Sequence, residues 1–331
     1  MRYASLLLAA FALAGNLARA ADLPVPIRPV QRIALPGVEG RIDHMAVDVK
    51  GQRLFVAALG NHSVEVLDLA AGKQLHRISA LPEPQGIAYL PELDRIVVAS
   101  AGDGSCRFFD GRTYRQTAKI DLGEDADNVR YDAAAGCLYV GHGQGALAAI
   151  DLERQQRIAD VPLPGHPESF QLEAQGNRIF VNLPTARQIA VIDRHKRAVT
   201  ACWPVKLARA NFPMALDEAD HRLLVACREP ARMLVFDTET GQVVSWLNCP
   251  GDADDLFFDP RQKRVYVTGG DGWTGVYEQA DRDHYRPLGK VATAPGARTS
   301  LFVPATGFLY VAVPHRGAQE AAIWGYQMSG E

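Results

Sequence analysis

The chain repeats one short pattern seven times between Arg41 and its C-terminal end. Each copy is a run of β-branched, aromatic and apolar residues that opens at an arginine, a glycine or another turn residue, as expected of a buried strand. The seven runs are Gln52–Ala57, Asp94–Ala99, Gly136–Gly141, Asn177–Asn182, His221–Ala226, Lys263–Thr268 and Gly307–Ala312. Their starts are separated by 42, 42, 41, 44, 42 and 44 residues. A period in the low forties with several short strands per period is typical of a β-propeller that has one four-stranded blade per repeat.

The same pattern predicts four strands in each blade. In the first blade these are Met45–Val49, Arg53–Ala57, Ser63–Leu69 and Gln74–Ile78. The last repeat ends after Ala321–Tyr326 without a fourth strand, and Gln31–Gly37 resembles the closing strands of the other repeats. We therefore expect an all-β, seven-bladed propeller with four antiparallel strands per blade, formed by residues 28–328 as a single domain. Its N-terminal strand closes the last blade, which removes two exposed sheet edges.

The N-terminus predicts export. Arg2 precedes the apolar run SLLLAAFALA, which is too short to span a bilayer, and the sequence Ala18-Arg19-Ala20 has the small-x-small pattern of a cleavage site. We interpret residues 1–20 as a secretory signal peptide cleaved after Ala20, followed by a short linker over residues 21–27. The alternative is a membrane anchor, which the short apolar core disfavours. We expect a periplasmic or secreted monomer with no membrane span after cleavage.

Composition and motifs exclude several classes of protein. The net charge of −3 lacks the basic excess that nucleic-acid-binding proteins usually carry, so we expect no nucleic-acid partner. The sequence contains no Walker, CxxCH or HExxH motif, and we expect no nucleotide, flavin or haem cofactor. The five cysteines form no CxxC pair, and we interpret them as small buried side chains, with a cross-strand disulfide left open.

One tetrapeptide carries a resemblance to a known family. The sequence Tyr266-Val267-Thr268-Gly269 is similar to the motif that names the YVTN-repeat propellers of the YncE-like group. The resemblance covers essentially the whole mature chain and implies a secreted seven-bladed propeller. It implies no particular activity, because one fold hosts many functions.

Acidic residues recur in three columns, of which two are interpreted as structural. The first column ends the innermost strands and comprises Asp48, Asp132, Glu173, Asp217 and Asp259. The second ends the third strands and comprises Asp68, Asp110, Asp151, Asp193 and Asp237. Both fall where the chain reverses, and short acidic side chains at such positions accept hydrogen bonds from turn backbone.

The third column lies where each innermost strand begins, at the mouth of the central channel. Around the ring it reads Asp43, Gln85, Asp127, Glu168, Phe212, Asp254 and Thr299. Four carboxylates this close together cannot all ionise unless their pKa values rise or a cation lies among them. We predict one divalent cation bound by Asp43, Asp127, Glu168 and Asp254. Oxygen ligands favour Ca²⁺ or Mg²⁺, and His44 leaves Zn²⁺ or Mn²⁺ as alternatives. The competing interpretation is that these groups only hydrogen-bond neighbouring blades or channel waters.

Basic residues are predicted to surround the same opening. Loops after the second strands and the connections between blades supply arginines and histidines, from which we select His142, Arg228, Arg298 and Arg316 as ligand-binding candidates. His166 belongs to this rim. Basic groups around an acidic floor suit a small, anionic ligand that bridges to a cation.

Three functions are consistent with this arrangement. The first is an exported protein that binds a small-molecule ligand at the channel mouth. The second is a metal-dependent, lactonase-like hydrolase with His44 or His315 as proton acceptor. The segments Ala126–Val129 and Ala253–Leu256 resemble channel motifs of the six-bladed paraoxonases, and this resemblance implies a metal in the same column. The third is a scaffold whose faces bind an exported protein partner.

Overall fold

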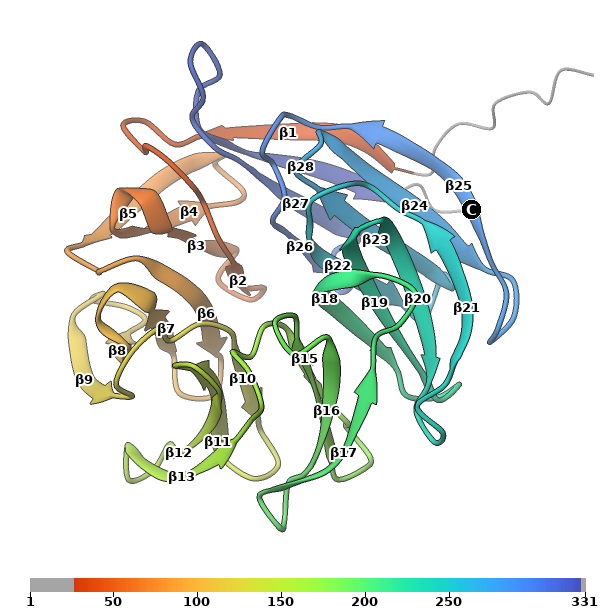
Figure 1. The fold of residues 1–331 in the computed structure, drawn as a ribbon. Coiled ribbons are helices and arrows are strands. Elements are labelled where there is room, and N and C mark those ends of the chain that lie inside the picture. Colours follow the sequence, from red (N-terminus) through yellow and green to blue (C-terminus); the bar gives the residue numbers. More distant parts are fainter. Residues whose placement is uncertain (1–26, 329–331) are drawn as a thin grey trace, which may run out of the picture.

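The computed structural model describes residues 27–328. Seven antiparallel sheets of four strands each are arranged around a central axis, as Figure 1 shows. Among the described residues, helix is limited to the 3₁₀ turns η1 (Leu59–Asn61) and η2 (Ala101–Asp103). The predicted fold is confirmed in class, in blade number and in strands per blade.

The first four blades follow the chain in order. Blade one contains β2 (Met45–Asp48), β3 (Arg53–Ala58), β4 (Ser63–Asp68) and β5 (Lys73–Ser79). Blade two contains β6 (Pro84–Leu90), β7 (Arg95–Ser100), β8 (Ser105–Asp110) and β9 (Gln116–Asp121). Blade three contains β10 (Val129–Asp132), β11 (Cys137–His142), β12 (Ala146–Asp151) and β13 (Gln156–Pro162). Blade four contains β14 (Phe170–Leu172), β15 (Arg178–Leu183), β16 (Gln188–Asp193) and β17 (Ala198–Pro204).

The remaining blades continue the same order until the last one. Blade five contains β18 (Arg209–Asp217), β19 (Arg222–Glu229), β20 (Ala231–Asp237) and β21 (Val243–Asn248). Blade six contains β22 (Ala253–Asp259), β23 (Arg264–Gly269), β24 (Trp273–Gln279) and β25 (Tyr285–Ala292). Blade seven contains β26 (Ser300–Val303), β27 (Phe308–Val313), β28 (Ala322–Met328) and, as its outer strand, β1 (Ile27–Ala34).

The N-terminal strand closes the ring as the sequence predicts. β1 pairs antiparallel with β28, from Ile27 opposite Met328 to Ala34 opposite Ala322. The strand begins at Ile27, one residue before the predicted start of the domain. The predicted signal peptide over residues 1–20 and most of the predicted linker lie outside the described residues. Within residues 27–328, no helix has the length and apolar character that a membrane crossing requires.

Apolar packing between neighbouring blades holds the propeller together. The second and third strands are buried along nearly their whole length, whereas outer strands such as β9 and β21 alternate between exposed and partly buried residues. Leu54 and Val56 of blade one pack in one cluster with Tyr310 and Ile323 of blade seven. Burying each large side chain of this kind contributes roughly 1.5–3 kcal/mol.

The two structural columns of acids behave as expected. Asp68 Oδ1 accepts a hydrogen bond from the Ala71 amide at 2.8 Å, and Asp193 Oδ1 accepts one from Lys196 at 2.9 Å. In the inner column, Glu173 Oε2 accepts a hydrogen bond from the Arg178 amide at 2.9 Å.

No disulfide links the described cysteines. Cys106, Cys137 and Cys227 are buried, as expected, whereas Cys202 on the outer strand β17 is exposed.

Candidate functional site

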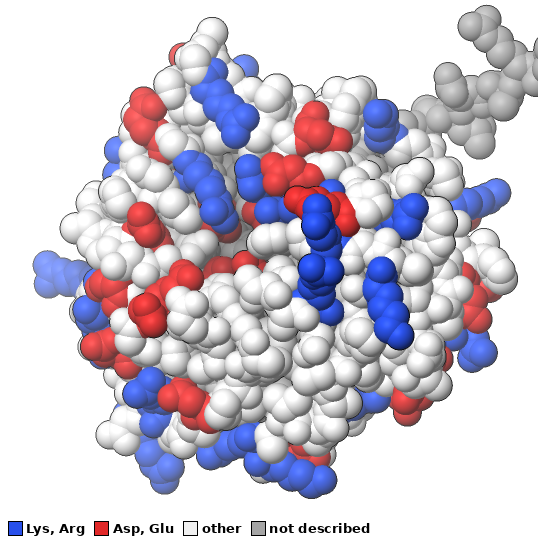
Figure 2. All heavy atoms as spheres, viewed as in Figure 1, with Lys and Arg blue, Asp and Glu red and all other residues white. Residues whose placement is uncertain are grey.

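The channel mouth is built from the residues that directly precede the innermost strands. Their backbone amides donate hydrogen bonds to carbonyl oxygens of the second strand of the same blade. The pairs are Asp43 to Ala57 at 2.7 Å, Asp127 to Gly141 at 2.9 Å and Glu168 to Asn182 at 3.0 Å. Because the innermost strands surround the axis, these side chains converge on one opening. Figure 2 shows a hollow near the centre of this face, with acidic and basic side chains close together around it.

A cavity of about 270 Å³ lies at this opening. Its walls come from strands of blades two, five and six and from the connections that lead into blades one, three, four and seven: Arg41, Gln85, Asp125, Asp127, His166, Glu168, Phe212, Arg228, Asp254 and Arg298. A glycine lets two blades approach closely beside it. A Cβ at Gly86 would lie 2.1 Å from the Asp127 carbonyl oxygen, so no larger residue fits there without moving Asp127.

In one half of the opening, arginines already neutralise the acids. Arg41 Nη2 lies 2.6 Å from Asp43 Oδ2 and 3.9 Å from Asp254 Oδ2, and Arg228 Nη2 lies 2.5 Å from Asp254 Oδ1. Burial raises the pKa of Asp43, and burial together with the charge of Asp43 raises the pKa of Asp254. The ion pairs offset part of this cost. Asp43 and Asp254 are therefore committed to protein cations.

His44 is held between two carboxylates next to this half. Its Nε2 lies 3.6 Å from Asp43 Oδ1, and its Nδ1 lies 3.6 Å from Asp255 Oδ1. Burial opposes the charged imidazolium, but Asp255 and Asp43 outweigh it and raise the pKa of His44 to about 10. His44 is consequently an ion-pair partner at neutral pH and a poor proton acceptor.

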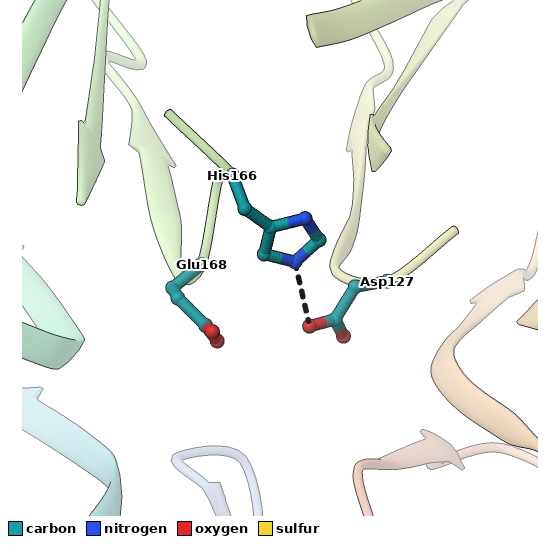
Figure 3. A group of neighbouring side chains, drawn as sticks. All are labelled: Asp127, His166 and Glu168. Carbon is teal, nitrogen blue, oxygen red and sulfur yellow. Dashed lines mark ion pairs between the residues drawn. The ribbon is translucent and has the colours of Figure 1, made fainter. Parts of the chain in front are cut away.

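In the other half, Asp127, His166 and Glu168 face one another. Each offers one potential ligand atom, and these atoms all lie within 4.8 Å of one another (Figure 3). His166 Nδ1 lies 2.6 Å from the Gly143 carbonyl oxygen, which can only accept a hydrogen bond. Nδ1 therefore carries a proton, and Nε2 points toward Asp127 Oδ2 at 4.0 Å.

These three groups lack the neutralising arginines of the first half. Among the described residues, the Glu168 carboxylate makes no hydrogen bond or ion pair. Burial, followed by the charges of Asp127 and Asp254, raises the pKa of Glu168 to about 8. Burial disfavours the imidazolium of His166, yet Asp127, Gly143 and Asp125 raise its pKa to about 9. The half-site therefore attracts positive charge, either protons or a cation.

Two further acids contact basic residues of the opening, one in each half. Asp125 and Asp252 each stand two residues before a ring residue, and both have left-handed backbone, with φ of 45° and 54°. Asp125 Oδ2 lies 3.5 Å from His166 Nδ1, and Asp252 Oδ2 lies 2.9 Å from Arg298 Nη2. Glu83 and Ala210, which stand at the same position in blades two and five, are left-handed as well, so this backbone conformation belongs to the repeat.

Only part of the predicted set meets at the cavity. The structure brings Asp127, Glu168, Asp254, Arg228 and Arg298 together in its lining. Asp43 and His44 stand next to it without lining it.

The other predicted candidates are placed elsewhere. His142 is buried against Asp160 at 3.1 Å, and His315 pairs with Glu39 at 2.7 Å. A Cβ at Gly296 would lie 2.5 Å from the Arg316 guanidinium carbon, so that side chain packs on the Gly296 backbone.

The sequence analysis placed His166 in the basic rim and did not predict it as a metal ligand. It stands two residues before Glu168, as Asp125 stands before Asp127 and Asp252 before Asp254. A polar residue at this position in several blades is the signal that could have identified it.

Comparison with known proteins identifies the fold. No protein-family model and no curated protein matches the sequence. A chain of the Kuenenia stuttgartiensis hydrazine synthase structure is similar, with a TM-score of 0.72 and 16% identity over 86% of this chain and 99% of that chain. A chain of the mitotic checkpoint complex crystal structure has a TM-score of 0.76 and 12% identity over 98% of both chains. At these identities the likeness shows a seven-bladed propeller fold alone, and the YVTN-repeat resemblance stays a prediction.

Proposed function

We propose that the channel mouth binds a divalent cation through Asp127, His166 and Glu168, and that this cation holds a small anionic ligand in the cavity. One observation carries the proposal. Because His166 Nδ1 is committed to the Gly143 carbonyl, its Nε2 faces the carboxylates of Asp127 and Glu168, with all three ligand atoms within 4.8 Å. Cations bind such atoms at about 2.0–2.6 Å, so the side chains need to close by about an ångström.

The donor set bears on which cation would fit. Two carboxylates suit Mg²⁺, Ca²⁺ and Mn²⁺, whereas an imidazole nitrogen suits Zn²⁺ and other transition metals. With His166 in the set, we expect Mn²⁺ or Zn²⁺ to bind more tightly than Ca²⁺ or Mg²⁺, the reverse of the order expected from carboxylates alone. The Gly143 carbonyl would then serve as the outer partner that fixes the ligating tautomer of His166.

Charge balance assigns separate roles to the cation and the arginines. Arg41, Arg228 and Arg298 pair with Asp43, Asp254 and Asp252, so they add no net positive charge to the cavity. The charge of an anionic ligand would therefore be met mainly by the cation, while the arginines' remaining N–H groups would donate hydrogen bonds. A cavity of about 270 Å³ limits the ligand to a small molecule such as a short carboxylate. The proposal includes export, which rests only on the signal peptide predicted over residues 1–20.

Binding is favoured over hydrolysis by the positions of the candidate bases. His44 is paired with two carboxylates, His315 is paired with Glu39, and neither lines the cavity. Neither is placed to take a proton from a molecule held there.

The test is a metal titration of tag-free protein that has been treated with a chelator. A cation that binds only the folded state, added at about a hundred times its dissociation constant, should stabilise the protein by roughly 2.7 kcal/mol. The double variant Asp127→Asn/Glu168→Gln should lose this gain, and the matched control Asp193→Asn, in a turn on the other face, should keep it.

The absence of a bound cation predicts the opposite change in stability. If no cation binds, the double variant relieves repulsion between carboxylates and should be more stable than the parent protein. A parent protein indifferent to Mn²⁺, Zn²⁺, Ca²⁺ and Mg²⁺, together with a stabilised double variant, would overturn the proposal.

A further inference from the structure

The residue that opens the second strand is an arginine in five of the seven blades. These residues are Arg53, Arg95, Arg178, Arg222 and Arg264. The exceptions are Cys137 in blade three and Phe308 in blade seven. This position lies at the end of the propeller opposite the channel mouth, because each innermost strand leads away from the mouth and the second strand returns to it.

Where the arginine is present, it can fill the space between its blade and the next. Arg53 of blade one donates to the Gly111 carbonyl and lies 3.2 Å from Asp94, both in blade two. Arg178 of blade four lies 2.8 Å from Glu239 in blade five, and Arg222 of blade five lies 2.6 Å from Asp283 in blade six.

Where the arginine is missing, a groove opens. A cavity of about 750 Å³ lies between blades three and four with Cys137 in its wall, and one of about 430 Å³ lies between blades seven and one with Phe308 in its wall. At the first of these interfaces, Arg194 of blade four forms an ion pair with Asp132 of blade three, with Nη1 at 2.7 Å from Oδ2. The larger groove therefore stays open without loss of the contact between blades.

The walls of the larger groove combine apolar surface with positive charge. Tyr131, Tyr139, Ile158 and Leu172 supply the apolar surface. Its two acids are already paired, Asp132 with Arg194 and Glu173 with Arg178 at 2.6 Å.

At one end of the groove lies the turn that carries His195 and Arg197. Neither side chain makes a hydrogen bond or an ion pair with another described residue, and both are exposed. The uncommitted charge in the groove is therefore positive.

We infer that the groove between blades three and four is a second binding site, which takes a small aromatic molecule carrying a carboxylate or sulfonate. Its volume is within the range of small-molecule sites. The aromatic body would lie against Tyr131, Tyr139 and Leu172, and the anionic group would lie toward Arg197.

The test uses two fluorescent dyes, the anionic anilinonaphthalene sulfonate and the neutral phenylnaphthylamine. The folded protein should bind the sulfonate at one saturable site. Cys137→Arg restores the arginine of the other blades and should abolish binding, while Cys137→Ala should retain it. Phe308→Arg fills the smaller groove and serves as the matched control, which should bind as the parent does. If Cys137→Arg fails to fold, Ala134→Trp blocks the same groove from an exposed turn.

A second arm tests the chemistry of the ligand. Arg197→Ala should weaken the sulfonate about tenfold and leave the neutral dye unchanged, because only the sulfonate pairs with the guanidinium. The inference is overturned if the parent shows no saturable site, or if groove-filling variants with normal melting temperatures bind as before. It is also overturned if Phe308→Arg alone removes binding, or if Arg197→Ala binds the sulfonate like the parent.

Discussion

The guanidinium carbon of Arg228 lies 3.6 Å from the centroid of the Phe212 ring, while its Nη2 lies 2.5 Å from Asp254 Oδ1. Phe212 takes a ring position that carries a carboxylate in four other blades. Its ring packs against the guanidinium of Arg228 and, unlike a carboxylate, does not repel the neighbouring acids. Phe212 and Arg228 thus form a platform that keeps Asp254 neutralised. Together with the Arg41–Asp43 pair, it leaves the ring with a paired half, Asp43 and Asp254, and an unpaired half, Asp127 and Glu168.

Removing the guanidinium of Arg228 should leave the buried charge of Asp254 unpaired. Arg228→Met keeps most of the side-chain volume but leaves Asp254 without its close partner, and we expect a loss of about 3 kcal/mol in unfolding free energy. Asp254→Asn in the same protein should restore most of that loss, because the unpaired charge is then absent. Denaturant unfolding of the four proteins in this cycle measures the coupling. If the two losses simply add, the two side chains are not coupled.

The pH dependence of stability should report His44. Its folded pKa of about 10 lies above the ordinary value of 6.5, so its stabilisation is complete below about pH 6.5 and is lost as pH rises through about 10. Asp43, Asp255 and, more distantly, Asp127 are the acids that face it. At about pH 7, His44→Gln should therefore cost about 3 kcal/mol, and the difference from the parent should shrink toward about pH 10.5.

A matched histidine serves as the control for this pH profile. His195→Gln, in an exposed turn, should change stability little at any of these pH values. A gap for His44→Gln that is constant or that widens with pH would show that His44 is not held as an imidazolium.

The fold could be predicted from the sequence because a propeller repeats one local pattern. Every blade has the same strand spacing, and the segment Gln31–Gly37 matches the closing strands of other blades, so even the closure of the ring was visible. The turn acids were visible for the same reason, since Asp68 and Asp193 bond to backbone only three residues away.

The organisation of the site could not be predicted in the same way, because it depends on contacts between blades. Position in the repeat gives Asp127 and Asp254 the same role, and only the folded structure brings Arg228 to Asp254 and His166 toward Asp127. The grooves on the other face are a different case. Cys137 and Phe308 interrupt a column of arginines that can be seen in the sequence. The sequence alone does not show that these arginines fill the space between blades, so the grooves could not be predicted from it.

The turn acids should affect stability and leave cation binding unchanged. Asp68→Ala removes one turn hydrogen bond and should cost about 1 kcal/mol. Asp237→Ala should cost more, because Asp237 Oδ1 accepts from the Thr240 amide at 2.8 Å and Oδ2 lies 2.8 Å from Arg222 Nη1. Chemical unfolding gives both values, and the metal titration above gives the affinities. Loss of cation binding in either variant at normal stability would contradict the separation of structural from site acids.

Closure of the ring by β1 should be essential to stability. Deleting Arg28–Gly37 removes nearly all of the strand that pairs with β28, together with the buried side chains of Ile33 and Leu35. The loss exposes the hydrogen-bonding edge of β28 and opens the apolar cluster shared by blades one and seven. We expect a lower melting temperature and association into larger species, measured by thermal unfolding and light scattering. The point variants Ile33→Asp and Arg32→Asp separate burial from strand pairing, because Ile33 faces the core and Arg32 faces solvent. Ile33→Asp should reproduce the destabilisation, whereas Arg32→Asp should melt like the parent. A deletion variant that stays monomeric and melts like the parent would show that the ring does not depend on this strand.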